Sequence, residues 1–178
     1  MKRRIIVITG EGKGKTTSAI GASVRALGRG FKVLFYQFIK SKDAEYGEHL
    51  FFEKSKKMNI VRLGKGCRKD FKYSEEDIKA AVKGLKRIDI EMHELLKKNR
   101  TKKQFLVVLD EVSYPVAWKW FDAKDVIKLM DKYADVNFIL TGRSMSQEII
   151  EVADTVSNIQ ENRHAYQKGL KAQIGVEF

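Results

Sequence analysis

A glycine-rich stretch near the start of the chain, ITGEGKGKTTSAIG at residues 8–21, has residue types suited to binding phosphate. The common phosphate-binding loop has the pattern G-x-x-x-x-G-K-[ST]. Gly14, Lys15 and Thr16 match the end of that pattern, but Thr9 stands where the first glycine is expected. The stretch therefore keeps the phosphate-binding end of the pattern and departs from it at the loop entry.

The residue types in this stretch suggest how a polyphosphate would be held. Glycines allow backbone N–H groups to turn inward around an anion, and the following helix adds a partial positive charge. The Lys15 ammonium can reach phosphate oxygens, and the Thr16 hydroxyl can bind Mg²⁺. A glycine-rich turn without a ligand is the alternative. The order of strand, loop, lysine, threonine and helix instead predicts a nucleotide-binding loop of Thr9, Gly10, Glu11, Gly12, Lys13, Gly14, Lys15, Thr16 and Thr17.

A second group of candidate ligands follows an apolar run, FLVVLDEV at residues 105–112. The run ends in Asp110 and Glu111, and carboxylates at a strand end can bind Mg²⁺ directly or through water. An acidic strand end without a metal is the alternative. Beside a phosphate loop, the pair favours a site for a nucleoside triphosphate with Mg²⁺, in which Thr16, Asp110 and Glu111 are the candidate metal ligands.

These groups need a sheet whose strands end at one edge, and the hydrophobic pattern predicts one. Short apolar runs typical of strands buried on both faces occur at residues 4–8, 33–38, 59–63, 105–109, 137–141 and 155–159. Helical patterns occur at 16–27, 74–99, 122–133 and 146–153. Strands alternating with helices predict an α/β fold of the RecA-like P-loop type, with a mostly parallel sheet of about six strands flanked by helices. We expect a single domain over residues 1–178.

Composition narrows the class of partner. The formal net charge is +12, which suits acidic ligands such as nucleotides, although lysines spread along the chain also suit a solvated surface. No nucleic-acid recognition motif is present, so a basic nucleic-acid-binding module is an alternative that we do not favour. No apolar run reaches the roughly 20 residues of a membrane span, and the single cysteine, Cys67, fits a reducing compartment. We therefore expect a cytoplasmic protein without membrane contact.

Several stretches together give a specific resemblance. They are TGEGKGKTTSAIG, VLFYQFIKS, VVLDEVSYPVA, ILTGRSMSQEIIEVADTVS and RHAYQKGLKAQIGVEF. The sequence closely resembles the corrinoid adenosyltransferases of the BtuR/CobO/CobA type, from about residue 5 to the C-terminus. The GxGKGKTT loop and the C-terminal KAQIG are the most specific markers. The resemblance implies that the altered spacing of the loop is a trait of this family.

The resemblance implies a reaction in which the Co(I) of a reduced corrinoid attacks the 5′ carbon of ATP and triphosphate leaves. The corrinoid would be cobalamin, cobinamide or cobyrinic acid a,c-diamide, and the resemblance does not choose among them. It implies catalytic roles for Lys15, Thr16 and Glu111, Mg²⁺ as cofactor with Mn²⁺ as an alternative, and ATP bound with its α-phosphate near the loop lysine. A homodimer and a flavoprotein reductase partner are also implied. The alternative is an ordinary RecA-like ATPase that hydrolyses the γ-phosphate.

The resemblance also carries roles to residues outside the loop. Arg25 matches an arginine near the nucleotide, and Gln37 matches a strand-end residue that could contact the corrinoid. Arg143 in TGR follows another strand end and could touch phosphate or a partner subunit. For His164 a hydrogen-bonded structural role is favoured. Trp118 and Trp120 are expected to pack, with a subunit contact as the alternative.

Two features depart from the family pattern. Better-known members have a Gly-Phe-x-Trp motif whose aromatic residues help to displace the lower ligand of the corrinoid, whereas this chain reads GKGCRKDFKY at residues 64–73. Gly66, Cys67, Lys69 and Phe71 are therefore our corrinoid-binding candidates, with Tyr73 as a further aromatic in a shifted register. The chain also begins almost at its first strand, so we expect either a more open ATP site or a different cover, with residues 40–57 as the candidate cover.

Overall fold

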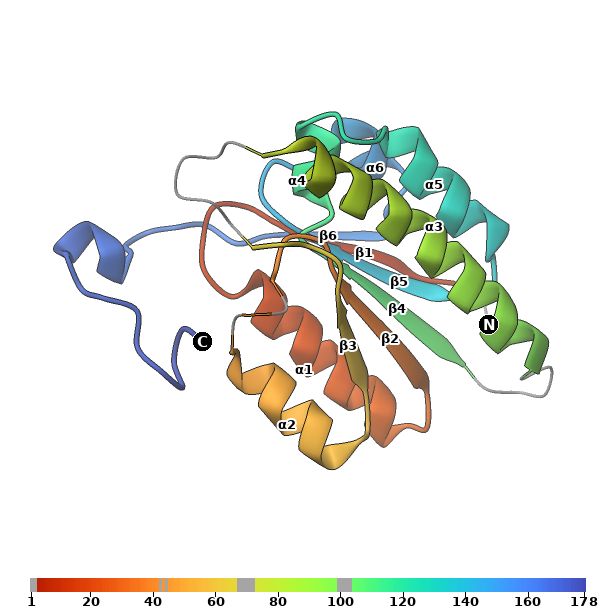
Figure 1. Ribbon diagram of the computed structural model, residues 1–178, viewed down its shortest axis with the longest axis horizontal. Helices are drawn as coiled ribbons and strands as arrows, with labels where there is room; N and C mark the ends of the chain where they lie inside the picture. Colours follow the sequence, from red (N-terminus) through yellow and green to blue (C-terminus); the bar gives the residue numbers. More distant parts are fainter. Residues whose placement is uncertain (1–2, 42, 44, 67–72, 99–103) are drawn as a thin grey trace.

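Six parallel strands form one sheet in the computed structural model, with the order β3-β2-β4-β5-β1-β6 (Figure 1). The structure describes residues 3–41, 43, 45–66, 73–98 and 104–178. The strands are β1 (Ile5–Thr9), β2 (Lys32–Gln37), β3 (Asn59–Arg62), β4 (Phe105–Asp110), β5 (Asn137–Thr141) and β6 (Thr155–Asn158).

Helices cover both faces of the sheet. They are α1 (Lys15–Gly28), α2 (Gly47–Ser55), α3 (Glu75–Lys98), α4 (Ser113–Ala117), α5 (Ala123–Lys132) and α6 (Gln147–Glu151), followed by the 3₁₀-helix η1 (Ala165–Lys168). Figure 1 shows α1 and α2 on one face, and α3, α5 and α6 on the other. In the described ranges, no helix combines the length and the apolar character needed to cross a bilayer.

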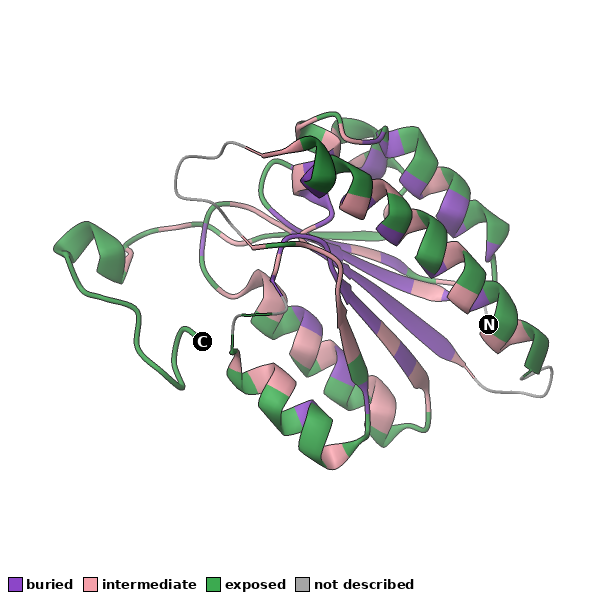
Figure 2. Ribbon diagram, in the orientation of Figure 1, coloured by how far each residue is buried: buried purple, intermediate pink, exposed green. Residues whose placement is uncertain are grey.

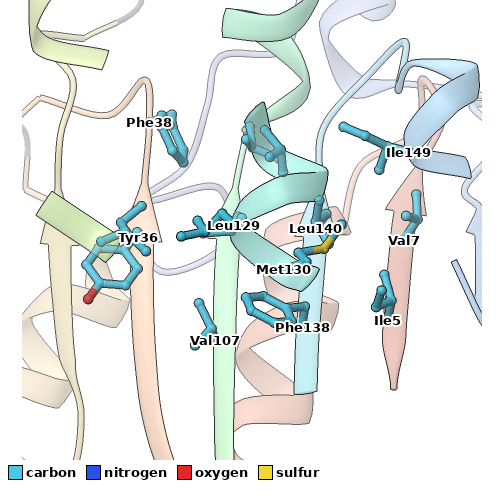
Figure 3. Packing of buried hydrophobic residues seen from close by; sticks show 14 of the residues in the cluster. Ile5, Val7, Tyr36, Phe38, Val107, Leu129, Met130, Phe138, Leu140 and Ile149 are labelled. Atoms are coloured by element: carbon cyan, nitrogen blue, oxygen red, sulfur yellow. The ribbon is translucent and has the colours of Figure 1, made fainter. Parts of the chain in front are cut away.

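Alternate residues of the central strands supply two cores. Val107 and Leu109 of β4 belong to the core under α3, α5 and α6, whereas Leu106 and Val108 belong to the core under α1. All six residues of β4 are buried, and Figure 2 shows burial concentrated in the middle strands. Figure 3 shows side chains of α5 packed over these strands beside Phe138. This two-sided burial explains why the strands read as continuous apolar runs.

The predicted fold class is confirmed, and so are the six predicted strands, with ends that shift by one residue or so. The long predicted helix is α3, and its start is capped by Ser74 and Asp77, because Ser74 N donates to Asp77 Oδ2 at 2.7 Å. The predicted helix at 146–153 is shorter, at Gln147–Glu151. Helices α2 and α4 were not predicted. The predicted cover at 40–57 contains α2.

The strand order changes one expectation about the carboxylates. The sequence suggested that Asp110 lies directly beside the loop that follows β1, but β5 lies between β1 and β4. Thr141, the last residue of β5, is therefore placed between the loop and the carboxylates. Residue spacing along the chain does not determine which strands are neighbours, so this insertion could be seen only in the folded structure.

Candidate functional site

The carboxyl ends of the parallel strands surround a cavity of about 470 Å³. One wall is the glycine-rich loop and the start of α1, from Gly12 to Thr17. Glu111 and Arg143, which follow β4 and β5, line it as well. The start of α2 and the C-terminal residues 175–178 complete the lining. This edge is where ligands bind in open α/β sheets.

The loop is anchored at its entry and open at its exit. Gly10 has φ of 100°, and a Cβ there would lie 2.2 Å from Asn158 Oδ1. Gly14 has φ of 113°, but a Cβ would meet nothing within 4 Å. Gly12 N donates to Ile159 O at 2.8 Å, which ties the loop to the end of β6. Only glycine fits the entry, because both the backbone angle and the space exclude a side chain.

Thr9, at the position of the missing first glycine, binds the sheet edge and not the cavity. Its hydroxyl donates to Gly142 O at 2.9 Å. Gly142 itself has φ of 140°, and a Cβ there would lie 1.9 Å from Ser113 Oγ. The residue that replaces the first glycine therefore forms a hydrogen bond to the segment that follows β5. The part of the loop that faces the cavity keeps the glycine, lysine and threonine of the common pattern.

Lys15 is held at the centre of the loop. Its Nζ donates to Gly10 O and Gly12 O, each at 2.7 Å. Burial lowers the pKa of the ammonium group, and the positive charge of Arg143 lowers it further. The side chain also lines the cavity. An ammonium group in this place can exchange a carbonyl partner for a phosphate oxygen without a large movement.

Asp110 is the centre of a buried hydrogen-bond network. The residue is fully buried at the end of β4. It accepts hydrogen bonds from Thr141 Oγ1 at 2.6 Å, Thr16 Oγ1 at 3.0 Å and Gln37 Nε2 at 3.0 Å. Burial raises the pKa of Asp110, and these donors oppose that shift because they favour the ionised carboxylate. The network fixes the carboxylate between β2, β5 and α1.

Glu111 extends into the cavity from a left-handed backbone position. Its φ is 61°, a conformation that costs a non-glycine residue about 1 kcal/mol and is often found at functional sites. Its backbone N donates to Thr141 Oγ1 at 2.9 Å. Burial, and next the negative charge of Asp110, raise the pKa of the Glu111 carboxyl to about 7. The carboxyl can therefore gain or lose its proton near neutral pH.

The oxygen atoms of Thr16, Asp110 and Glu111 fit a magnesium ion that is shared with a nucleotide. Mg²⁺ prefers oxygen ligands and is usually held by one or two carboxylates together with substrate phosphates. Across the described ranges, no group of three or more histidine, cysteine, aspartate or glutamate side chains could hold a metal by itself. Two carboxylates and a hydroxyl thus suit a metal that arrives with polyphosphate.

The outer rim of the site is charged and exposed. Lys13 Nζ contacts Val176 O at 3.1 Å and Glu177 Oε1 at 2.7 Å, so the C-terminal segment folds back onto the loop. Arg143 forms an ion pair with Glu11 at 3.4 Å. Sequence reasoning used KAQIG only as a family marker and assigned no role to the residues after it, which line the cavity.

Other predicted residues lie farther from the cavity. Arg25 is in the last turn of α1, about 15 Å from Lys15 at 1.5 Å per residue, and does not line the cavity. Gln37 is fully buried and its side chain binds Asp110, so no surface is left for a corrinoid to contact. Gly66 lies beside a small pocket of about 10 Å³. The remaining corrinoid candidates, Cys67, Lys69 and Phe71, lie outside the described residues.

His164 lines the cavity and also has the structural contact that we expected. Its Nδ1 accepts a hydrogen bond from Tyr166 N at 3.2 Å and caps η1.

A second cavity, of about 120 Å³, shares Lys40, Glu111 and Tyr114 with the first. Aromatic rings from three segments line it: Tyr46, Tyr73, Tyr114 and Trp118. The ring centroids of Tyr73 and Trp118 lie 4.4 Å apart, and those of Tyr114 and Trp118 lie 5.2 Å apart. The sequence predicted packing for Trp118, with a subunit contact as the alternative. The spacing of Tyr114 and Trp118, one helical turn apart, was the available signal for a shared face.

A family model described as ATP:corrinoid adenosyltransferase BtuR/CobO/CobP matches residues 1–178. A corrinoid adenosyltransferase of Escherichia coli K12 is 31% identical over 98% of this chain and 85% of its own. One from Sinorhizobium is 32% identical over 99% of this chain and 81% of its own. The flagellar accessory protein FlaH of Methanocaldococcus jannaschii, a solved structure, has a TM-score of 0.56 at 11% identity and covers 88% of this chain and 70% of its own, which is a likeness of fold alone.

Proposed function

The chain belongs to the BtuR/CobO/CobP family of ATP:corrinoid adenosyltransferases, and from that premise we propose how its site performs the transfer. In the proposed reaction, Co(I) of a reduced corrinoid attacks the 5′ carbon of ATP. A cobalt–carbon bond forms, the carbon–oxygen bond to the α-phosphate breaks, and inorganic triphosphate leaves with the bonding electrons. The cavity that brings the phosphate loop and Glu111 together is the observation that supports this proposal most strongly.

Because the corrinoid supplies the nucleophile, the protein mainly has to orient the ribose and stabilise the leaving group. Triphosphate leaves with several negative charges. The N–H groups of the loop and the side chains of Lys13, Lys15 and Arg143 lie on the cavity wall, where they can neutralise those charges. Lys15 would exchange a loop carbonyl for a phosphate oxygen, and Lys13 would exchange Glu177 for another.

We propose that Thr16, Asp110 and Glu111 hold Mg²⁺, or Mn²⁺ in its place, together with the triphosphate. A bound divalent cation would supply further charge neutralisation for the leaving group. Asp110 is held by three hydrogen bonds before any ligand arrives, so its orientation costs little when the complex forms. Gly12, Gly14 and Thr17, which line the cavity, would complete the loop contacts, whereas Thr9, Gly10 and Glu11 lie outside its lining.

The aromatic cavity beside Glu111 supports a corrinoid position on that side of the nucleotide. If the α-phosphate lies near Lys15, the 5′ carbon points toward Glu111 and the aromatic rings. Tyr73 and Trp118 would then take the place of the aromatic residues of the Gly-Phe-x-Trp motif. We expect Trp118→Ala to raise the KM for the corrinoid severalfold and leave the KM for ATP unchanged. Trp120→Ala, beside the cluster but outside this cavity, is the matched control.

Two further expectations remain proposals. A homodimer is supported by β6, an edge strand whose four residues are all exposed, and by the exposed side chains of Leu170 and Ile174 in the C-terminal segment. Sedimentation of the full chain would test it. A cytoplasmic location and a flavoprotein that supplies electrons for Co(I) would follow from the chemistry of the substrate, because Co(I) survives only under reducing conditions.

The direct test is incubation of the protein with ATP and chemically reduced cobalamin or cobinamide. We expect the absorbance change of alkylation, a light-sensitive product, and one triphosphate for each adenosylcorrinoid. The ATPase alternative, which the family match does not favour, predicts ADP and phosphate without an alkylated corrinoid. Lys15→Ala should abolish turnover under either mechanism, so it tests the site and not the reaction.

A further inference from the structure

A chain of hydrogen bonds joins α2 to the buried carboxylate of the site. His49 Nε2, on the first turn of α2, lies 2.6 Å from Gln37 Oε1. Gln37 Nε2 in turn donates to Asp110 Oδ2 at 3.0 Å. Gly47 and Glu48, which precede His49, line the nucleotide cavity. These hydrogen bonds therefore connect the helix whose start lines the cavity with the carboxylate that binds Thr16.

The chemistry of these groups sets the direction of every hydrogen bond. The NH₂ group of the Gln37 amide faces Asp110, because Gln37 Nε2 donates to Asp110 Oδ2. The amide oxygen then faces His49, and because this oxygen only accepts, His49 must donate from Nε2. A neutral imidazole that carries its proton on Nε2 satisfies both contacts. The orientation of the Gln37 amide thus selects a His49 ring that carries a proton on Nε2.

The surroundings of the two side chains fit this assignment. Gln37 is fully buried and lies in register with Asp110 on the neighbouring strand, so its side chain is available to the carboxylate and not to a substrate. His49 Nδ1 is buried without a hydrogen-bond partner among the described residues. Burial, together with the positive charge of Arg62, lowers the pKa of His49 and favours the neutral ring. An unpartnered Nδ1 lone pair costs less than an unpartnered N–H would.

We propose that His49 is a positioning residue for Asp110. It holds the Gln37 amide in the orientation that donates to Asp110, which fixes the carboxylate with both oxygens within hydrogen-bond distance of Thr16 Oγ1. Placement of α2 over the cavity and orientation of the carboxylate are therefore coupled. The role of Asp110 as a Mg²⁺ ligand rests on the function proposed above, whereas the action of His49 on Asp110 rests on the hydrogen bonds alone.

The test is the Mg²⁺ concentration at which ATP binding is half-maximal, measured by equilibrium dialysis. His49→Leu removes the donor, and we expect it to raise this concentration roughly tenfold, the effect of losing one hydrogen bond to a buried group. ATP affinity at saturating Mg²⁺ should stay the same. His49→Gln returns an N–H donor near Nε2 and should restore the midpoint to within about threefold. His93→Leu, an exposed histidine of α3, is the matched control.

A wild-type midpoint in His49→Leu would overturn the proposal, as would a His49→Gln variant as impaired as His49→Leu. Binding of ATP that does not depend on Mg²⁺ in the wild type would overturn it too. The dialysis needs no corrinoid, so the outcome can be read even if the protein forms no adenosylcorrinoid. Failure of the proposed reaction and failure of this inference are thus separate results.

A double-mutant cycle tests whether His49 acts through Gln37. Gln37→Met keeps the volume and removes both hydrogen bonds, and the double variant with His49→Leu should be no worse than Gln37→Met alone. Additive effects would show that His49 acts by another route. Two-bond nitrogen–proton correlation spectra of the labelled wild type should show His49 protonated at Nε2 only, and a proton on Nδ1 would contradict the assignment.

Discussion

The two halves of the site differ in how firmly their charged groups are held. Asp110 is fully buried and accepts hydrogen bonds from three side chains that come from three different elements. Lys13, on the phosphate side, is half-exposed and bound to a C-terminal segment whose residues are all exposed. The side around Asp110, where we propose the metal binds, is therefore ordered before the substrates arrive, whereas the phosphate side can exchange its partners. A site with this division can bind and release a highly charged product without rebuilding its centre.

The largest effect on turnover should come from replacing the carboxylate of the buried Asp110. Asp110→Asn keeps the shape of the side chain, but it replaces one carboxylate oxygen, a proposed metal ligand, with an NH₂ group that must face hydrogen-bond donors. We expect turnover to fall by roughly 10²–10³, a loss typical of a preorganised electrostatic group. Steady-state kinetics over a Mg²⁺ titration would measure it, with Asp135→Asn as an exposed control. Near-normal turnover would mean that the buried centre is not where catalysis is controlled.

The anchored and open ends of the loop should respond differently to a single methyl group. Gly10→Ala would place Cβ 2.2 Å from Asn158 Oδ1, whereas Gly14→Ala would meet no neighbour within 4 Å. Both carry the cost of positive φ, about 1 kcal/mol, but Gly10→Ala adds a steric clash and should lose several kcal/mol. Denaturant unfolding would rank them. Gly21→Ala, inside α1, should instead stabilise by about 0.5–1 kcal/mol. Equal losses at residues 10 and 14 would contradict the anchored entry.

The pH dependence of metal binding should follow Glu111. Burial raises the pKa of this carboxyl from 4.5 to about 7, and Mg²⁺ binds the ionised form. The Mg²⁺ concentration for half-maximal turnover should therefore fall as pH rises, by up to about tenfold per pH unit below the pKa. A higher Mg²⁺ concentration should lower the pH at which turnover is half-maximal. Glu111→Gln should bind Mg²⁺ weakly at every pH, with Glu148→Gln as the exposed control.

The same shift has a consequence for stability without metal. Between pH 4.5 and about pH 7, the folded protein keeps a proton on Glu111 that the unfolded chain has released. The free energy of unfolding should then decrease as pH rises through this window, and Glu111→Gln should reduce the slope. Thermal unfolding in a chelator at several pH values would measure it. A slope that is unchanged in Glu111→Gln would show that another group is responsible.

The smallest effect on ligand binding should come from the exposed ion pair between Lys13 and Glu177. Glu177→Gln breaks an ion pair with Lys13 that is partly exposed and screened by solvent, so the loss should change stability little. Lys13 would then be free for phosphate, so ATP affinity should rise by no more than about threefold, and less at high salt. Glu53→Gln is the control. Weaker ATP binding in Glu177→Gln would mean that the C-terminal segment helps to close the site over the nucleotide.

Local sequence patterns were enough to predict the sheet, the phosphate loop and part of the site. The apolar runs predicted all six strands because strands buried on both faces carry little else, and the loop motif requires the strand and helix around it. The family was also recognisable, because its markers extend over most of the chain. Asp110 and Glu111 were found because they directly follow a buried strand.

The parts that escaped prediction depend on contacts between distant residues. No local pattern places Thr141 between the loop and the carboxylates, or brings Tyr73 against Trp118. His49 had no motif around it, and its role appears only where α2 meets the end of β2. Gln37 was expected at the substrate surface, but burial on both sides of its strand directs it to Asp110.

The most direct test of the account is to determine which bond of ATP breaks. ATP carrying ¹⁸O at the bridging oxygen between the 5′ carbon and the α-phosphate would be incubated with the protein and a Co(I) corrinoid. Attack at carbon predicts that all of the label leaves in intact triphosphate, in equal amount to the adenosylcorrinoid. Label that stays with the nucleoside, accompanied by release of the terminal phosphate, would contradict the account.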